Sequence, residues 1–309
     1  MPMDDLDQQL ARRDALSVAR LLGREAPHAG DPVGFTATRV RIAALLLAVW
    51  ATDPEIREAL RLVFEAAAPD QRALLALGDI DTWDRDGRPA RRWWAQAAAG
   101  PDPDLAALGA WRAARADVRG GRRGDALPLL EQASLAGIAE ASVLLGRLLE
   151  RDGDHEGAAA AFRRSRTGEG LLRLAEERLR ADDLDGAERE LAGFRAAPHR
   201  PGAADQRAWE QAIRGEIAFG RGDLDRARGH FEAAGRAPGT WDRRIGLRLA
   251  QIAVADADPV FAHHWISRLA EGDDAEAEQA RLLRDLHRDL VDEGARRLEQ
   301  GCDEEEDDW

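Results

Sequence analysis

The apolar residues of this chain recur with the spacing of amphipathic α-helices. In the stretch LLGRLLERDGDHEGAAAAFRRSR, residues 144–166, an apolar run ends at Gly153-Asp154 and resumes with Ala158 and Phe162, four residues apart. A spacing of three or four places side chains on one face of a helix. Glycine tolerates the left-handed geometry that ends a helix, and aspartate caps the next one. The stretch therefore predicts two helices joined by a short turn.

The same arrangement recurs along the chain with a period near 34 residues. Each copy has a small residue twelve positions before an alanine and a larger apolar residue four positions after it. The six alanines, which stand 29 to 40 residues apart, are Ala90, Ala126, Ala158, Ala187, Ala227 and Ala262. Such a period holds two helices of about a dozen residues and two turns. The small residues allow the two helix axes to approach to about 8 Å.

These residues resemble tetratricopeptide repeats and, between Leu77 and Leu149, the related Sel-one-like repeats. The resemblance covers residues 70–270 and includes the segment LALGDIDTWDRDGRPARRWWAQAAAGPDPDLAALG. It implies an all-α fold, an α-α superhelix (solenoid) of about six helix-turn-helix repeats with helical caps. A generic helical bundle is the competing prediction, because small residues coincide easily in an alanine-rich chain. The chain departs from the family where tyrosine is favoured, at Asp81, Asp117, Leu149, Arg178, Ala218 and Ala253.

The two ends of the chain lack the repeat pattern. Residues 1–69 predict an N-terminal helical cap or degenerate repeats, with three helices over 5–24 and 36–68 and a helix start at Asp53-Pro54. Residues 70–272 form the expected repeat array. Residues 273–300 predict one charged amphipathic helix that closes the apolar end of the array. Residues 301–309 carry six carboxylates in the last eight positions, which predicts an acidic disordered tail.

Composition excludes several functions. All 44 basic residues are arginine, and lysine, asparagine and tyrosine are missing. Because the codons of all three are A/T-rich, a high-GC bacterial genome is the favoured explanation, and selection against modification of amines is the alternative. A chain without lysine has no Walker phosphate-binding lysine, no kinase strand lysine and no amine for a Schiff base.

Charge and cysteine usage predict a cytoplasmic protein that binds neither membranes nor nucleic acid. The single cysteine, Cys302, cannot form an intrachain disulfide or a multi-cysteine zinc site. The acidic start does not look like a secretory signal. The apolar run from Ile42 to Val49 is shorter than the roughly 20 residues of a membrane span. A net charge of −14 opposes binding to a phosphate backbone.

Several strings mimic functional signatures, and each has a simpler structural explanation. His287-Arg288-Asp289 copies the start of a kinase catalytic loop, but Gly294 stands where the magnesium-binding asparagine is needed. The adjacent pair His263-His264 points in directions about 100° apart on a helix. Arg-Gly-Asp at 123–125 and 221–223, and the pairs Asp182-Asp183 and Asp256/Asp258, fall at expected turns. We therefore predict no enzymatic activity, no cofactor and no metal site.

Arginine and tryptophan mark the candidate binding surface. The resemblance implies that the first helix of each repeat lines the inner face of the array. Carried onto this sequence, it places near that face Trp111, Arg115, Arg119, Arg147, Arg151, Arg180, Trp209 and Arg244. Aromatic residues and arginine are typical of interface hot spots. The prediction is a non-enzymatic scaffold or adaptor that binds a peptide or helix of a partner protein in this groove.

Two further hypotheses remain open at this point. One alternative is a regulatory sensor whose repeats bind a peptide signal and control a separately encoded enzyme or transcription factor. The other is an intramolecular contact of the acidic tail, which ends in Trp309, with the arginine groove; a solvated tail that aids solubility is its alternative. The lysine and asparagine clamp with which some tetratricopeptide proteins hold acidic C-termini is excluded, because this chain contains neither residue.

Overall fold

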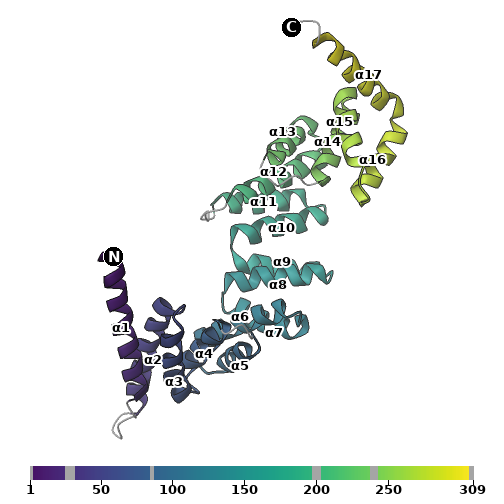
Figure 1. The fold of residues 1–309 in the computed structure, drawn as a ribbon. Helices are drawn as coiled ribbons and strands as arrows, with labels where there is room; N and C mark the ends of the chain where they lie inside the picture. The colour runs from purple at the N-terminus through teal and green to yellow at the C-terminus, as the bar shows by residue number, and fades with distance from the viewer. Residues whose placement is uncertain (1–2, 25–31, 84–86, 197–202, 237–242, 306–309) are drawn as a thin grey trace. The chain divides into compact units, whose positions relative to one another are not determined.

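A computed structural model describes residues 3–24, 32–83, 87–196, 203–236 and 243–305. Within these ranges the regular structure is entirely α-helical, in seventeen helices (Figure 1). The helices form two compact units, Met1–Ser165 (unit 1) and Arg166–Trp309 (unit 2). Even the apolar helix α2 (Pro32–Trp50) is not suited to crossing a membrane, and the same holds for every other described helix.

Unit 1 begins with a helical bundle and continues as packed helix pairs. Helices α1, α2 and α3 lie where three helices were expected over 5–24 and 36–68. The expected cap at Asp53 is confirmed, since its side chain accepts hydrogen bonds from the backbone N–H groups of Glu55 and Ile56. From α4 to α9 each helix packs against the next. The remaining bounds are α1 Met3–Arg24, α3 Pro54–Ala67, α4 Gln71–Trp83, α5 Gly87–Ala98, α6 Pro103–Arg119, α7 Arg123–Leu135, α8 Ala139–Arg151 and α9 His155–Ser165.

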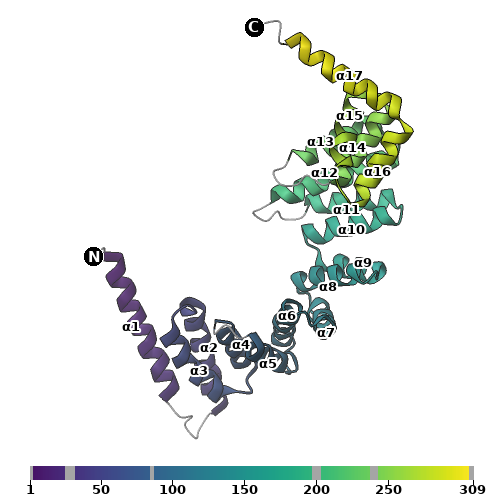
Figure 2. The same ribbon diagram turned by 45° about the vertical axis from the view of Figure 1, so that its right-hand side comes forward.

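Unit 2 consists of successive pairs followed by a two-helix end. Helices α10 and α11, α12 and α13, and α14 and α15 pack as pairs, and α10 also contacts α12 (Figure 2). Both α16 and α17 pack against α15. The bounds are α10 Gly168–Arg180, α11 Leu184–Ala196, α12 Ala203–Gly220, α13 Leu224–Gly235, α14 Arg243–Ala255, α15 Pro259–Ala270, α16 Ala275–Leu286 and α17 Arg288–Glu305.

The expectation of one helix over 273–300 is wrong. The chain turns at His287, which ends α16, and α17 starts at the next residue. The turn allows Ala280 of α16 and Val291 of α17 to share one core with Leu269 of α15. A single straight helix could not bury both of its parts on the same short neighbour. Helix α17 continues to Glu305, so residues 301–305 are helical where an extended tail was expected, and 306–309 lie outside the described residues.

The repeat alanines lie at the closest contacts between paired helices. All six are fully buried. In three repeats the small residue on the first helix is glycine, and an aromatic ring of the second helix lies directly over it. A Cβ added to the glycine would come within 2.2–2.5 Å of the ring in the pairs Gly78 with Trp94, Gly146 with Phe162, and Gly215 with Phe231. The ring thus covers the glycine itself.

The other three repeats have alanine in place of glycine, and there the facing residue is aliphatic. These pairs, each within a single buried cluster, are Ala114 with Leu130, Ala175 with Leu191, and Ala250 with Ile266. All six repeats thus have either a glycine–aromatic pair or an alanine–aliphatic pair. A larger residue on one helix is thus matched by a smaller one on its partner.

The turns between the paired helices share one hydrogen-bond pattern. In five of them a residue with positive φ precedes the capping residue, as in Gly153 at 79° and Gly222 at 77°. The N–H of the capping residue donates to the carbonyl five positions earlier, for example Asp154 N to Leu149 O at 3.0 Å. This is the Schellman arrangement. Of the two aspartate pairs expected at turns, Asp183 and Asp258 cap the following helices. Asp182 has a positive φ, and Asp256 pairs with Arg228.

Two carboxylates stand where the repeat family favours tyrosine: Asp117 joins two successive helix pairs, and Asp81 joins the N-terminal bundle to the first pair. Asp117 of α6 is fully buried and contacts Arg91 of α5 through two nitrogens, at 3.0 and 3.1 Å, and Arg122 at 2.8 Å. Asp81 of α4 accepts hydrogen bonds from Arg61 at 2.7 Å and from the Trp93 indole at 2.9 Å. Ion pairs therefore take the place that a tyrosine ring has in the family.

Candidate functional site

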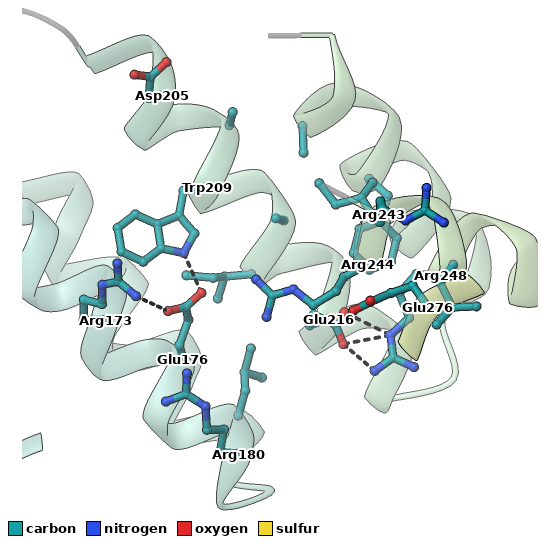
Figure 3. A pocket seen from close by; sticks show the side chains of 18 of the residues that line it. Arg173, Glu176, Arg180, Asp205, Trp209, Glu216, Arg243, Arg244, Arg248 and Glu276 are labelled. Atoms are coloured by element: carbon teal, nitrogen blue, oxygen red, sulfur yellow. Dashed lines mark hydrogen bonds and ion pairs between the residues drawn. The ribbon is translucent and has the colours of Figure 1, made fainter. Parts of the chain in front are cut away.

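A cavity of about 1050 Å³ lies in unit 2 against the first helices of successive pairs. Its wall is built mainly from α10, α12 and α14, with smaller contributions from α13 and α16. We call it the Trp209 pocket, because Trp209 lies in the middle of its α12 wall (Figure 3). Its charged lining consists of Arg173, Glu176, Arg180, Asp205, Glu216, Arg243, Arg244, Arg248 and Glu276.

Two neighbours on α10 fix the orientation of Trp209. The indole N–H donates a hydrogen bond to Glu176 Oε1 at 2.8 Å. The Arg173 guanidinium lies over the indole, 4.6 Å from the ring centroid. Arg173 also contacts Glu176, at 3.5 Å. Cation–π contact and a satisfied indole N–H hold a large aromatic side chain in one orientation at the pocket surface.

Glu176 occupies an unusual electrostatic position in this wall. Burial raises its pKa above the ordinary value for glutamate. The hydrogen bond from Trp209 and the charges of Arg173, Arg180 and Arg244 act in the opposite direction but are smaller in sum. Figure 3 shows Arg244 reaching from α14 toward this carboxylate. Glu176 is therefore protonated more readily than an ordinary glutamate side chain.

On the α14 side of the pocket, Arg248 is paired with a carboxylate of α12, and Arg243 is paired with a residue outside the pocket lining. Arg248 forms a two-point ion pair with Glu216, with Nε–Oε1 and Nη2–Oε2 distances of 2.9 Å, and lies 4.6 Å from the centroid of Phe219. Arg243 pairs with Asp274 at 2.6 Å and donates to the carbonyl of Leu269. Arg243 is thus part of the junction between α14 and α16. Arg180 and Arg244 are the exposed arginines of the wall.

The predicted binding residues fall into two sets. Arg180, Trp209 and Arg244 line the Trp209 pocket of unit 2. The other five belong to unit 1, with Trp111, Arg115 and Arg119 on α6 and Arg147 and Arg151 on α8. Trp111 is half-buried with the Arg115 guanidinium 5.3 Å from its ring centroid, and the four arginines are exposed.

Sequence reasoning missed most of the charged residues of the pocket wall, among them Arg173, Glu176, Glu216 and Arg248. Helical spacing was the available signal. Arg173 and Glu176 stand seven and four positions before Arg180 on α10, and Arg248 stands four after Arg244 on α14. Residues three, four and seven apart share a helix face. The prediction included arginine and tryptophan but not the carboxylates that pair with them, Glu176 and Glu216.

The strings that mimic catalytic signatures lie in or between the last three helices. His287, Arg288 and Asp289 are exposed at the break between α16 and α17, and Gly294 packs against the backbone of Pro259. His263 is half-buried while His264 is exposed. Over the described ranges, histidine, cysteine, aspartate and glutamate nowhere gather in threes or more to hold a metal ion.

Comparison with known proteins supports the fold. No family model matches the sequence, and no curated protein matches it. A solved chain of the APC/C hetero-tetramer Cut9–Hcn1 is similar, with a TM-score of 0.50 and 14% identity over 79% of this chain and 52% of that one. This chain thus spans about half the length of that structure. Yeast Tom70 and a tetratricopeptide repeat protein from Parabacteroides merdae have TM-scores of 0.43 and 0.41, identities of 11% and 14%, and coverage of 94% and 81% of this chain and 74% and 98% of theirs.

The likeness in structure, at this low identity, speaks for the fold alone. The predicted all-α fold class, an α-α solenoid of helix-turn-helix repeats, is confirmed by the helix pairs and by this match. Tetratricopeptide repeat proteins are among the structural neighbours. The Sel-one-like assignment and the bacterial high-GC origin stay predictions.

Proposed function

We propose that this chain is a non-enzymatic scaffold or adaptor that binds a segment of a partner protein in the Trp209 pocket. The observation that supports this most is the fixed indole of Trp209, set between Arg173 and Glu176 and bordered by Arg180 and Arg244. Repeat arrays of paired helices present extended surfaces to partners. Tryptophan and arginine supply much of the energy of protein interfaces.

The chemistry of the wall favours a peptide with one apolar and one acidic side chain. The exposed arginines offer planar donors that match a carboxylate. The Trp209 ring and the neighbouring Ala212 and Ile213 offer an apolar surface beside them. A cavity of about 1050 Å³ has the size of a pocket that encloses a few side chains, since small-molecule pockets span roughly 300–1,000 Å³.

Affinity capture with matched variants tests the proposal. The wild-type chain, Trp209→Ala and Arg180→Ala/Arg244→Ala are immobilised, captured proteins are identified, and synthetic segments of them are titrated by fluorescence anisotropy. We expect each variant to bind the segment at least about tenfold more weakly, because truncation of a hot spot costs about 2 kcal/mol or more. Arg236→Ala is the control, since Arg236 is exposed at the end of α13 and outside the pocket lining. Equal binding by all four proteins contradicts the proposal.

The acidic tail supplies a second element of the proposal. Its last residues, 306–309, lie outside the described residues. We propose that the tail competes with the partner for the exposed arginines, since its carboxylates have the chemistry that the pocket favours. Removal of residues 302–309 should then raise the affinity for the captured segment, and unchanged affinity leaves the tail as a solubilising extension. The alternative function, a regulatory sensor that controls a separately encoded enzyme, would use the same pocket. The cytoplasmic location and the absence of nucleic-acid binding stay predictions.

A further inference from the structure

A second cavity of unit 2, of about 570 Å³, shares no lining residue with the Trp209 pocket. Helices α11 and α13 form its sides and α12 lies between them. We call it the His230 pocket. Both α11 and α12 contribute one helical stripe with spacing of three, four and seven, namely Glu188, Leu191, Ala192 and Arg195, and Arg214, Ile217, Ala218 and Arg221. Helix α13 and its cap add Asp223, Arg226 and His230.

The stripes divide the pocket into an apolar floor and a basic rim. Leu191 and Ile217 are buried and, with the two alanines, form the floor. Four arginines and one histidine face two carboxylates among the lining residues. In the Trp209 pocket five arginines face four carboxylates. Arginines therefore outnumber carboxylates by two in the lining of the His230 pocket and by one in the lining of the Trp209 pocket.

Carboxylates beside the pocket hold the guanidinium groups in place. Arg195 and Arg214 both contact Oε1 of Glu210, at 3.2 and 2.7 Å, and only a tenth of that side chain is exposed. The Arg214 Nε–H is buried and has no hydrogen-bond partner among the described residues. At the other end Arg221 contacts Asp185 at 2.7 Å and Glu188 at 2.8 Å. Each guanidinium carries five N–H donors, so these contacts leave donors for a ligand.

His230 responds to the positive charge of this rim. Burial lowers its pKa first, followed by the charges of Arg214 and Arg226, while Glu210 opposes them and Arg195 adds to them. Its Nδ1 lies 2.8 Å from Oε1 of Gln211. A bound anion would offset the arginine charges and raise the pKa again. A change in the pKa of His230 can therefore be used to detect anion binding.

We infer that the His230 pocket binds a phosphate monoester, with the phosphoryl group among Arg195, Arg214 and Arg226 and its organic part on Leu191 and Ile217. Arginine forks match phosphate oxygens, and several guanidinium groups from different helices suit a dianion better than a single carboxylate. The apolar floor exceeds what a bare inorganic ion would contact. The ester can be a free small molecule or a phosphorylated side chain, since both carry the same group.

Isothermal titration of the full chain at physiological salt tests the inference. The probes are phenyl phosphate, inorganic phosphate and phenol, together with a phosphotyrosine peptide and its unphosphorylated form. We expect phenyl phosphate to bind at least tenfold more tightly than inorganic phosphate, and phenol and the unphosphorylated peptide not to bind. The ratio between phenyl phosphate and the phosphopeptide identifies the source of the ester. Equal binding of phenol and phenyl phosphate overturns the inference.

Variants at the exposed rim show whether binding occurs in this pocket. Arg195 and Arg226 have side chains that are 62% and 79% exposed, so Arg195→Gln/Arg226→Gln should fold. We expect at least a tenfold loss of phenyl phosphate affinity in this variant and none in the control Arg236→Gln, which lies outside the pocket. Nuclear magnetic resonance titration of the wild type should show the pKa of His230 rising when phenyl phosphate is bound. Unchanged affinity in the double variant, or an unmoved His230 pKa, places the ligand elsewhere and overturns the inference.

Discussion

The size of one residue is matched to that of another at every helix pair of the six repeats. Glycine on the first helix faces Trp94, Phe162 or Phe231, and alanine faces leucine or isoleucine. Interiors are close-packed, so an added methyl group requires a removed one. The alternation also explains why glycine and alanine both satisfy the repeat pattern. Each repeat therefore fills the same helix crossing either with glycine and an aromatic ring or with alanine and an aliphatic side chain.

A double-variant experiment tests this matching. Gly146→Ala is expected to lower the free energy of unfolding by about 2 kcal/mol, because its Cβ would lie 2.4 Å from Phe162 Cε1 and overpacking costs roughly 1–3 kcal/mol. Phe162→Leu leaves space beside residue 146. The double variant should therefore lose less than the sum of the two single losses, as measured by urea unfolding.

An exposed glycine supplies the control for that experiment. Gly229 lies within α13, and an added Cβ there meets no atom within 4 Å. Gly229→Ala should raise stability by roughly 0.5–1 kcal/mol, since alanine is the better helix former. If the losses in the free energy of unfolding from Gly146→Ala and Phe162→Leu simply add, the Phe162 ring is not the reason that residue 146 is glycine, and the size matching is wrong.

Glu176 should make the stability of the chain fall as the pH rises. Its folded-state pKa is raised by burial, so the folded state holds its proton at pH values where the unfolded state, with a pKa near 4.3, has lost it. The favourable contribution is complete below the unfolded pKa and is lost as the pH rises through the folded pKa. Asp79 is raised by burial in the same way and adds to the trend.

Glu176→Gln removes this contribution while keeping an oxygen that can accept from Trp209. Urea unfolding between pH 4 and 7 should show that the wild type loses stability relative to the variant as the pH rises. The difference between the two proteins should follow the pKa of Glu176 measured in the folded wild type. A pH-independent difference would indicate that Glu176 contributes through packing alone.

At the scale of helices, the sequence pattern predicted most of the elements but missed one break. The apolar period continues from Ala277 through Leu286 to Leu298, so nothing local marks an end at His287. The break depends on α15, against which both α16 and α17 pack. Turns with glycine or a capping aspartate were predictable because their signal is local. A turn imposed by a distant neighbour leaves no such signal.

Gly294 is the residue that makes the α15–α17 contact close. A Cβ on it would lie 1.9 Å from the carbonyl oxygen of Pro259, which is backbone and cannot rotate away. Gly294→Ala is therefore expected to separate α17 from α15 and to destabilise unit 2 by about 2–3 kcal/mol. Hydrogen exchange should become faster throughout α17. Unchanged protection of α17 would show that the backbone adapts without losing the contact.

At the scale of the whole molecule, the fold was more predictable than the site. The repeat period, the buried alanines and the capped turns follow from local residue size and backbone geometry. Arg180, Trp209 and Arg244 line the Trp209 pocket, and the resemblance had led us to place them on the first helices of their repeats. Helical spacing places Glu176 on the face of Arg180, but its hydrogen bond with Trp209 and the ion pair of Glu216 with Arg248 join different helices, which spacing within one helix does not predict. Their roles depend on which arginines the packing of α10, α12 and α14 brings close.

The two sets of predicted arginines should differ in their share of partner binding. Arg115→Ala/Arg147→Ala/Arg151→Ala changes exposed side chains of unit 1, and Arg180→Ala/Arg244→Ala changes exposed side chains at the Trp209 pocket. Both variants should fold, because neither alters the core.

We expect the unit 2 variant to lose at least about tenfold in affinity for a captured partner, since its arginines border a fixed aromatic ring. The unit 1 variant should lose less, since the exposed ion pairs that it removes contribute only about 0.2–1 kcal/mol each. Anisotropy titrations with the same labelled segment compare the two losses. Equal and large losses would mean that the partner segment engages both units at once, with affinity multiplied by linkage. Unchanged binding in both variants would remove arginine from the interface.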